Sequence, residues 1–207
     1  MTTPTVLWSG STDDTAPLVV LLHGRGSNEL EMNTLATYLP QHFAIAALRG
    51  PVTLGATHFT WFENRGIGRP RPESLRSSLD WFRTWLDDVA ATRPVALVGF
   101  SGGTAFAGAA VLDDPTRFAG AALLYGTIPF DAGVATTPGR LESVRILHAQ
   151  GIDDDVMPRD LMLATWEYLH ERSGAELEAF STTGGHAIAP EVMAALPRWL
   201  ESVLATS

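Results

Sequence analysis

Ser101 lies at the centre of a glycine-rich turn, Gly99-Phe100-Ser101-Gly102-Gly103, which fits the pattern Gly-x-Ser-x-Gly. An apolar run precedes the turn and small residues follow it, as expected where a strand turns sharply into a helix. Glycines permit the close backbone approach that such a corner needs, and the corner exposes the serine hydroxyl. We therefore predict that Ser101 is a nucleophile. The alternatives are a plain glycine-rich turn and a phosphate-binding loop, but neither of the usual phosphate-loop motifs is present.

A serine hydroxyl needs a base to take its proton, and the base must itself be oriented by an acid. Of the six histidines, His186 is the candidate base, because it lies in a glycine-containing loop between the last predicted strand and the final predicted helix. We expect His23 and His148, which end apolar runs, to hydrogen-bond to loop backbone. We expect His42 and His170 to be exposed to solvent, and the role of the remaining histidine stays open.

Three adjacent carboxylates, Asp153, Asp154 and Asp155, follow another apolar run. They repel one another, so a purely structural loop gains little from having all three. One of them, turned toward the Nδ1–H of a histidine, would stabilise the imidazolium form of that histidine. Spacing alone does not choose among the three.

These candidates follow short apolar runs that alternate with segments of helical period. Near-continuous apolar strands are typical of a parallel sheet covered on both faces, so the alternation predicts an α/β fold with one doubly wound, mostly parallel sheet in a single domain, residues 1–207. Ligand sites in such sheets lie at the carboxyl ends of the strands. Strands are expected at 17–24, 43–50, 94–101, 118–126, 144–151 and 175–182, and helices over 75–89, 161–169 and 192–203.

Composition excludes several classes of protein. The net charge of -9 argues against a nucleic-acid partner, which requires a basic face. The chain has no cysteine, so disulfides, thiolate metal sites and a cysteine nucleophile are excluded. No apolar run approaches the roughly 20 residues of a membrane span, and the amino-terminal stretch does not resemble a secretory signal, so we expect a cytoplasmic protein without a membrane span. No metal or other cofactor is expected, because no His/Asp cluster has ligand spacing.

Five motifs, in order along nearly the whole chain, resemble those of the phospholipase/carboxylesterase family of α/β-hydrolases, which includes the acyl-protein thioesterases. The family has the motifs L-H-G-x-G, W-F-D, G-F-S-Q-G, H-G-x-x-D-x-V-V-P and G-H-x-x-x-P-E. The corresponding segments here are LLHGRGS, WFE, GFSGG, HAQGIDDDVMP and GGHAIAPE. The resemblance implies an α/β-hydrolase fold and a serine esterase that needs no cofactor.

Carried over residue by residue, the resemblance implies a catalytic triad of Ser101, Asp154 and His186. The acid is Asp154 because it matches the aspartate of the family motif when residues are counted back from Pro158. The oxyanion hole would consist of the backbone N–H groups of Gly102 and Arg25. Such donors typically supply a few kcal/mol each of transition-state stabilisation.

Two positions depart from the family pattern. Gly102 stands where the family usually has glutamine, so the backbone N–H is kept while the bracing contact of that side chain is lost. Arg25 stands where the family often has leucine, which puts a cation at the rim of the acyl pocket. This cation either favours negatively charged substrates or points outward to solvent.

The connections after the fourth and fifth predicted strands are too short for the helical cap that many relatives insert, so we expect an open cleft. The residues predicted to line it are Trp61, Phe62, Ile128 and Met157. For the Trp61-Phe62 pair, the alternative is a place in the ordinary core. Such a cleft suits a small-molecule ester with a short or medium acyl chain. Thioesterase and lysophospholipase activities use the same chemistry, while a peptidase and a non-catalytic small-molecule-binding protein are further alternatives. A dienelactone-type hydrolase is disfavoured because that group uses a cysteine nucleophile. A homodimer is left open.

Overall fold

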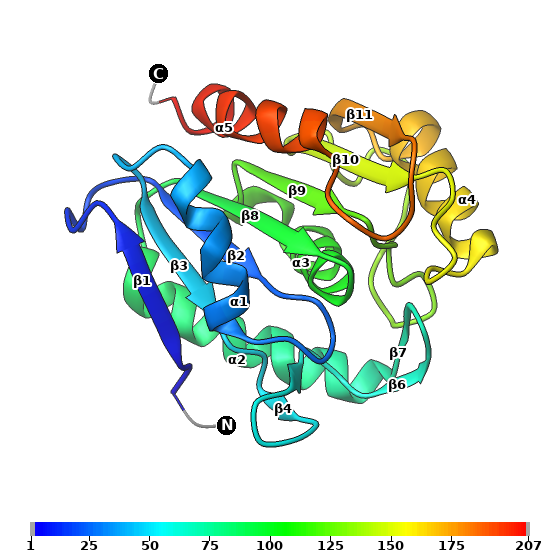
Figure 1. Cartoon of the computed structure of the whole chain (residues 1–207), viewed down its shortest axis with the longest axis horizontal. Helices are drawn as coiled ribbons and strands as arrows, with labels where there is room; N and C mark the ends of the chain where they lie inside the picture. Colours follow the sequence, from blue (N-terminus) through cyan, green and yellow to red (C-terminus); the bar gives the residue numbers. More distant parts are fainter. Residues whose placement is uncertain (1–2, 206–207) are drawn as a thin grey trace.

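The computed structural model describes residues 3–205 and is built around a seven-stranded sheet (Figure 1). The strands lie in the order β1-β3-β2-β8-β9-β10-β11. β1 pairs antiparallel with β3, and every other pair in this sheet is parallel. The bounds are β1 Val6–Gly10, β2 Leu18–Leu22, β3 Ala44–Leu48, β8 Val95–Phe100, β9 Gly120–Leu124, β10 Arg145–Gly151 and β11 Glu176–Thr182.

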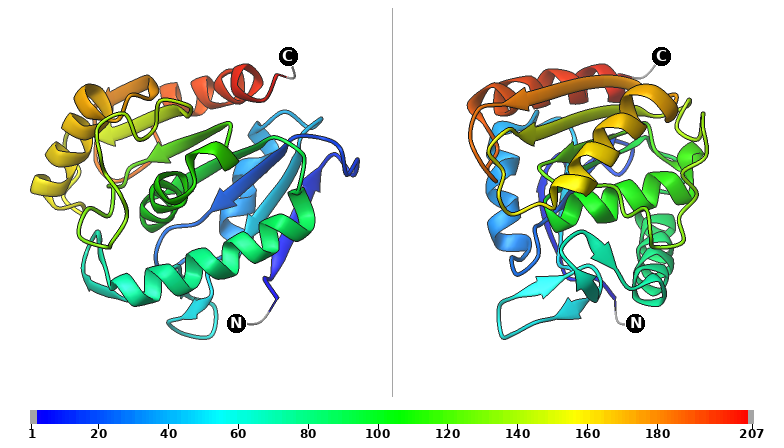
Figure 2. Two further views of the ribbon diagram at one scale, coloured as in Figure 1. Left: turned by 180° about the vertical axis from the view of Figure 1, so that it is seen from behind. Right: turned by 90° about the vertical axis from the view of Figure 1, so that its right-hand side faces the viewer.

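Helices cover both faces of the sheet (Figure 2). The helices α2 and α3 and the π-helical turn after α4 contribute to the hydrophobic core on one face, and α1 and α5 contribute to the core on the other. This arrangement confirms the predicted α/β-hydrolase fold. The helices are α1 Glu29–Asn33, α2 Pro72–Ala90, α3 Gly102–Asp113, α4 Arg159–Glu167 and α5 Pro190–Leu204; α4 continues as a π-helical turn at Tyr168–Arg172, and 3₁₀ turns lie at Thr34–Tyr38 and Pro115–Arg117.

The central strands are buried on both faces, which explains their continuous apolar sequences. In β2 all five residues are fully buried, with Val19 and Leu21 on one side of the sheet and Leu18, Val20 and Leu22 on the other. The six predicted strands are therefore present, each slightly shorter than its apolar run. The edge strand β1 was not predicted, because most of its residues are only half-buried and its sequence carries no strong apolar pattern.

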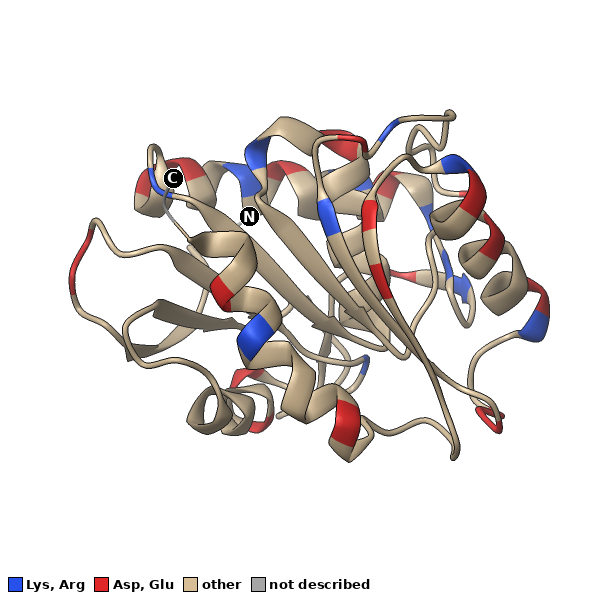
Figure 3. Cartoon of the chain, turned by 90° about the horizontal axis from the view of Figure 1, so that it is seen from above, with Lys and Arg blue, Asp and Glu red and all other residues tan. Residues whose placement is uncertain are grey.

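Two small hairpins lie beyond the end of β3, between that strand and α2 (Figure 1). One pairs β4 (Val52–Thr53) with β5 (Phe59–Thr60), and the other pairs β6 (Asn64–Gly66) with β7 (Arg69–Pro70). Acidic residues and arginines are interspersed over the helices in Figure 3. Within residues 3–205, no helix combines the length and apolar character needed to cross a membrane.

Candidate active site

Ser101 occupies a strained corner between β8 and α3. Its φ of 55° and ψ of -114° place a non-glycine residue in a conformation that L-residues rarely adopt. The corner is tight because backbone atoms of other residues approach two of its glycines closely. A Cβ at Gly99 would lie 2.4 Å from the carbonyl oxygen of Gly103, and a Cβ at Gly103 would lie 2.0 Å from that of Leu22. Glycine is therefore needed at both positions for the serine to be presented in this way.

The Ser101 hydroxyl, the His186 imidazole and the Asp154 carboxylate form a continuous hydrogen-bonded chain. The distance from His186 Nε2 to Ser101 Oγ is 2.8 Å, and that from Nδ1 to Asp154 Oδ2 is 2.7 Å. The other carboxylate oxygen, Oδ1, accepts hydrogen bonds from the backbone N–H groups of Val156 and Met157 at 2.9 and 3.0 Å. The Asp154 side chain is 1% exposed. Hydrogen bonds at both carboxylate oxygens therefore fix the orientation of Asp154 toward the histidine.

Parallel strand pairing brings the three side chains to the same edge of the sheet. Ser101 follows β8, Asp154 follows β10 and His186 follows β11, and the carboxyl ends of these parallel strands lie together. Of the three consecutive aspartates, Asp153 and Asp155 are exposed and only Asp154 hydrogen-bonds to His186. The geometry therefore selects the same aspartate as the family motif does.

The buried side chain of Tyr125 ties down both ends of the His186 loop, a role not predicted from the sequence. Its hydroxyl lies 2.8 Å from Thr182 Oγ1, before the loop, and accepts a hydrogen bond of 3.0 Å from the Ala189 N–H, after it. Tyr125 is also the only other non-glycine residue with positive φ between residues 3 and 205. The only sequence signal was its position directly after β9, at the same sheet edge.

The backbone N–H groups of Arg25 and Gly102 lie beside Ser101. A Cβ at Gly102 would lie only 3.0 Å from the Arg25 nitrogen, which shows how closely the two backbone segments approach. Within the described part of the chain, neither N–H donates a hydrogen bond. The pair can therefore receive an oxyanion, next to the amino terminus of α3. Because a side chain at position 102 would crowd the Arg25 amide, glycine suits this position.

Two cavities meet at Ser101. The smaller has a volume of about 320 Å³ and is walled by the β6–β7 hairpin together with Phe62, Ala105 and Met157. The larger has a volume of about 630 Å³ and extends along the His186 side past α1 to Tyr38, Ile188 and Met193. Arg25 and Ile67 line both cavities. Neither a residue of the hairpin nor Tyr38 was among the four residues predicted to line the cleft.

Two of the four residues predicted to line the cleft do so, and two do not. Phe62 and Met157 line the smaller cavity. Trp61 and Ile128 line neither cavity and are fully buried, so the prediction is wrong for both. Trp61 stacks on Phe106 of α3 with ring centroids 4.7 Å apart. Both side chains are held in the core under the site, because their large apolar surfaces pack against α3.

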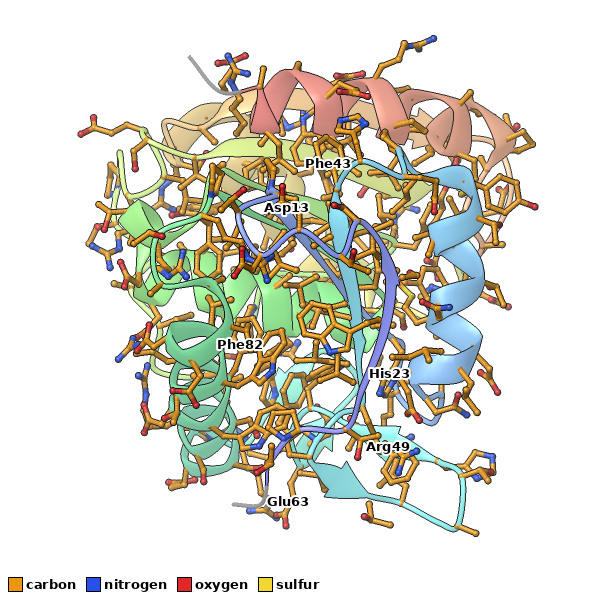
Figure 4. The ribbon with its side chains drawn as sticks, turned by 90° about the vertical axis from the view of Figure 1, so that its left-hand side faces the viewer. Asp13, His23, Phe43, Arg49, Glu63 and Phe82 are labelled. Carbon is orange, nitrogen blue, oxygen red and sulfur yellow. The ribbon has the colours of Figure 1, made fainter. Side chains whose placement is uncertain are left out.

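The remaining histidines follow the predictions except for His148. His23 Nδ1 lies 2.7 Å from the Gly24 carbonyl oxygen, and its Nε2 accepts a hydrogen bond from the Gly50 N–H, so it braces the loop as expected. It lies near Arg49 below the ends of β2 and β3 (Figure 4). His42 and His170 are exposed. The two ring nitrogens of His148 have no hydrogen-bond partner among residues 3–205, so the expected backbone contact is wrong.

His148 predicts an acid-sensitive stability. Burial, together with the charge of nearby His170, lowers the pKa of His148 from 6.5 to about 4. Below pH 6.5 the unfolded chain binds a proton here that the folded protein does not, so stability falls as the pH falls toward 4. The free energy of unfolding from urea titrations should drop by about 2 kcal/mol more between pH 8 and pH 5 in wild type than in His148→Leu. His170→Gln is the control and should keep most of this drop, whereas equal drops in wild type and His148→Leu would contradict the assignment.

No cluster of three or more His, Asp or Glu side chains suited to a metal ion occurs in the portion of the chain between residues 3 and 205. The chemistry available at the site is that of a serine hydroxyl, an oriented imidazole and two backbone donors. Such a constellation can form and hydrolyse an acyl-serine ester.

Comparisons with known proteins concern the family and the fold of the chain. The model of the phospholipase/carboxylesterase family matches residues 9–204. Among solved structures, a carboxylesterase from Bacillus cereus has a TM-score of 0.82 at 20% identity, over 97% of this chain and 94% of that one. A carboxylesterase from Mesorhizobium loti has a TM-score of 0.77 at 25% identity, over 91% of this chain and 89% of that one. Zea mays acyl-protein thioesterase 2 has a TM-score of 0.78 at 20% identity, over 97% of this chain and 99% of that one. No curated protein matches the sequence.

Proposed function

Since the chain belongs to the phospholipase/carboxylesterase family, we propose that it is a serine carboxylesterase that hydrolyses esters of short- to medium-chain carboxylic acids through an acyl-enzyme at Ser101. The observation that carries the proposal is the hydrogen-bonded chain from Asp154 through His186 to Ser101. The two cavities beside Ser101 are consistent with small acyl and alcohol groups.

The first half-reaction transfers the acyl group to the enzyme. His186 Nε2 takes the proton of the Ser101 hydroxyl as its oxygen attacks the ester carbonyl, and Asp154 stabilises the resulting imidazolium. The N–H groups of Arg25 and Gly102 donate to the carbonyl oxygen as it becomes an oxyanion. His186 then gives its proton to the departing alcohol, which leaves the acyl group bonded to Ser101.

The second half-reaction repeats these steps with water. His186 takes a proton from a water molecule that attacks the acyl-serine carbonyl, and the same two N–H groups stabilise the second oxyanion. Collapse of this intermediate returns the proton to Ser101 and releases the carboxylic acid. Thioesters and lysophospholipids would be cleaved by the same steps, so a substrate panel that includes both defines the range of leaving groups.

Labelling by a fluorophosphonate tests whether Ser101 is an activated nucleophile. We expect one phosphonyl group per wild-type chain, located on Ser101 by peptide mass spectrometry. In His186→Ala the labelling rate should fall by roughly 1,000-fold or more, because the hydroxyl loses the base that takes its proton. His170→Ala is the matched control, since His170 is exposed and belongs to α4's extension rather than to the site, and it should label like wild type. Equal labelling of wild type and His186→Ala would refute the proposal.

A further inference from the structure

We infer that the smaller cavity is the acyl site and that it selects acyl groups ending in a carboxylate, which the guanidinium groups of Arg65 and Arg25 recognise. The inference rests on the proposed esterase function and names the substrate class: monoesters of short dicarboxylic acids. The position of His186 and the charges that line each cavity support it.

The position of His186 assigns the two cavities. Its Nε2 must protonate the leaving oxygen, so the alcohol part of the ester lies on the His186 side of Ser101. The larger cavity includes His186 in its wall, and the smaller one does not. The acyl chain, which lies on the other side of the attacked carbon, therefore enters the smaller cavity. A volume of about 320 Å³ limits it to a short chain.

The smaller cavity carries positive charge without any opposing carboxylate. Arg25 and Arg65 line it, and none of the residues that wall it is acidic. Among residues 3–205, the Arg65 guanidinium donates only to a backbone carbonyl, that of Asp131, and Arg25 forms no ion pair. The carboxylates of Asp131 and Asp160 both form ion pairs with Arg69, and neither carboxylate lines the cavity.

The hairpin adds an uncharged polar group to the same wall. Asn64 lines the smaller cavity, and its buried Oδ1 has no hydrogen-bond partner among the described residues. A buried amide without a partner is costly unless a bound molecule or water satisfies it. Because Oδ1 only accepts hydrogen bonds, a water molecule or an O–H or N–H group of the substrate would satisfy it, while the guanidinium of the neighbouring Arg65 is the group that suits a carboxylate.

The larger cavity has no excess of positive charge, because it is lined by one guanidinium, that of Arg25, and one carboxylate, that of Glu31. The Glu31 carboxylate accepts a hydrogen bond of 2.6 Å from Ser27 Oγ. The remaining wall is mostly apolar, with Met32, Leu35 and Ile188 among its residues. A carboxylate on the alcohol part would therefore meet a like charge as well as a cation. The difference between the two cavities predicts that the enzyme favours a carboxylate on the acyl side only.

The test compares two esters of the same alcohol: 4-nitrophenyl hemiglutarate and the matching ester in which a terminal amide replaces the carboxylate. After subtraction of the enzyme-free rates, kcat/KM of the wild type should favour the carboxylate about tenfold. This ratio should fall to near one in Arg65→Gln, fall partly in Arg25→Gln, and be largely kept in Arg65→Lys. Raising the ionic strength should also lower it, because the contact is electrostatic.

Arg198→Gln is the matched control, because it removes the same charge from an exposed position on α5 and should leave the ratio unchanged. A second pair of esters, 4-carboxyphenyl and 4-carbamoylphenyl butyrate, places the carboxylate on the alcohol, and here the carboxylate should give no advantage. If the enzyme hydrolyses the neutral esters but shows no preference for the acyl-side carboxylate, this inference alone is overturned. The same holds if the kcat/KM ratio of the first ester pair is unchanged in both Arg65→Gln and Arg25→Gln. Failure to hydrolyse any ester would instead overturn the proposed function.

Discussion

Replacing Ser101 with alanine is expected to lower kcat for 4-nitrophenyl butyrate by roughly 10,000- to 1,000,000-fold. The variant keeps the oxyanion donors and both cavities but loses the oxygen that forms the acyl-enzyme. Stopped-flow measurements should also show that the initial burst of nitrophenolate, which reports formation of the acyl-enzyme, disappears. The residual rate would come from binding and from the two backbone N–H groups alone.

A serine elsewhere on the surface provides the control for this variant. Ser77 is exposed on α2, and Ser77→Ala should retain the wild-type rate. Circular dichroism should give the wild-type spectrum for both variants, since neither substitution adds atoms to the core. A Ser101→Ala enzyme with more than a tenth of wild-type activity would show that the hydrolysis occurs elsewhere.

Asp154→Asn is expected to lower kcat by about 10,000-fold, although it changes the shape of the side chain very little. Asn can still accept the two backbone hydrogen bonds of Val156 and Met157 through its oxygen, which leaves its NH2 facing His186. The imidazole must then accept at Nδ1 and carry its proton on Nε2. In that tautomer it cannot take the proton of Ser101.

The neighbouring aspartates make this prediction specific. Asp153→Asn and Asp155→Asn cause the same loss of one negative charge in the same loop, but both side chains are exposed. Their kcat values for the butyrate ester should stay close to that of wild type. Comparable losses in all three variants would mean that the charge of the loop matters and that the hydrogen bond to His186 does not.

The candidate site illustrates how a parallel sheet assembles residues that are distant in sequence. Ser101 and His186 are 85 positions apart, yet each lies in the segment that follows a strand of the same sheet. Tyr125 follows another of these strands and tethers the His186 loop. The strand ends thus supply the reacting side chains and also one group that holds them in position.

The local part of this design could be predicted from the sequence. The buried strands have unbroken apolar sequences because both of their faces are covered, and the corner at Ser101 needs glycines because backbone atoms meet there. Both constraints fix the types of residues that are neighbours in the sequence, so each can be recognised as a short sequence pattern. The family motifs extended this prediction to Asp154 and His186, which the structure brings within hydrogen-bond distance of one another and of Ser101.

Which side chains line the cavities beside Ser101 depends on the tertiary structure. Trp61 was expected at the cleft and lies in the core, while Arg65, from a hairpin with little apolar pattern, lines the smaller cavity. His148 ends a strand as His23 does, yet it has no partner within residues 3–205. Exposure at a cavity and the pairing of a buried polar group depend on which distant elements pack against a residue. The buried strands, the corner and the residue types available for chemistry can be read from the sequence, whereas packing between distant elements sets the surroundings of each side chain.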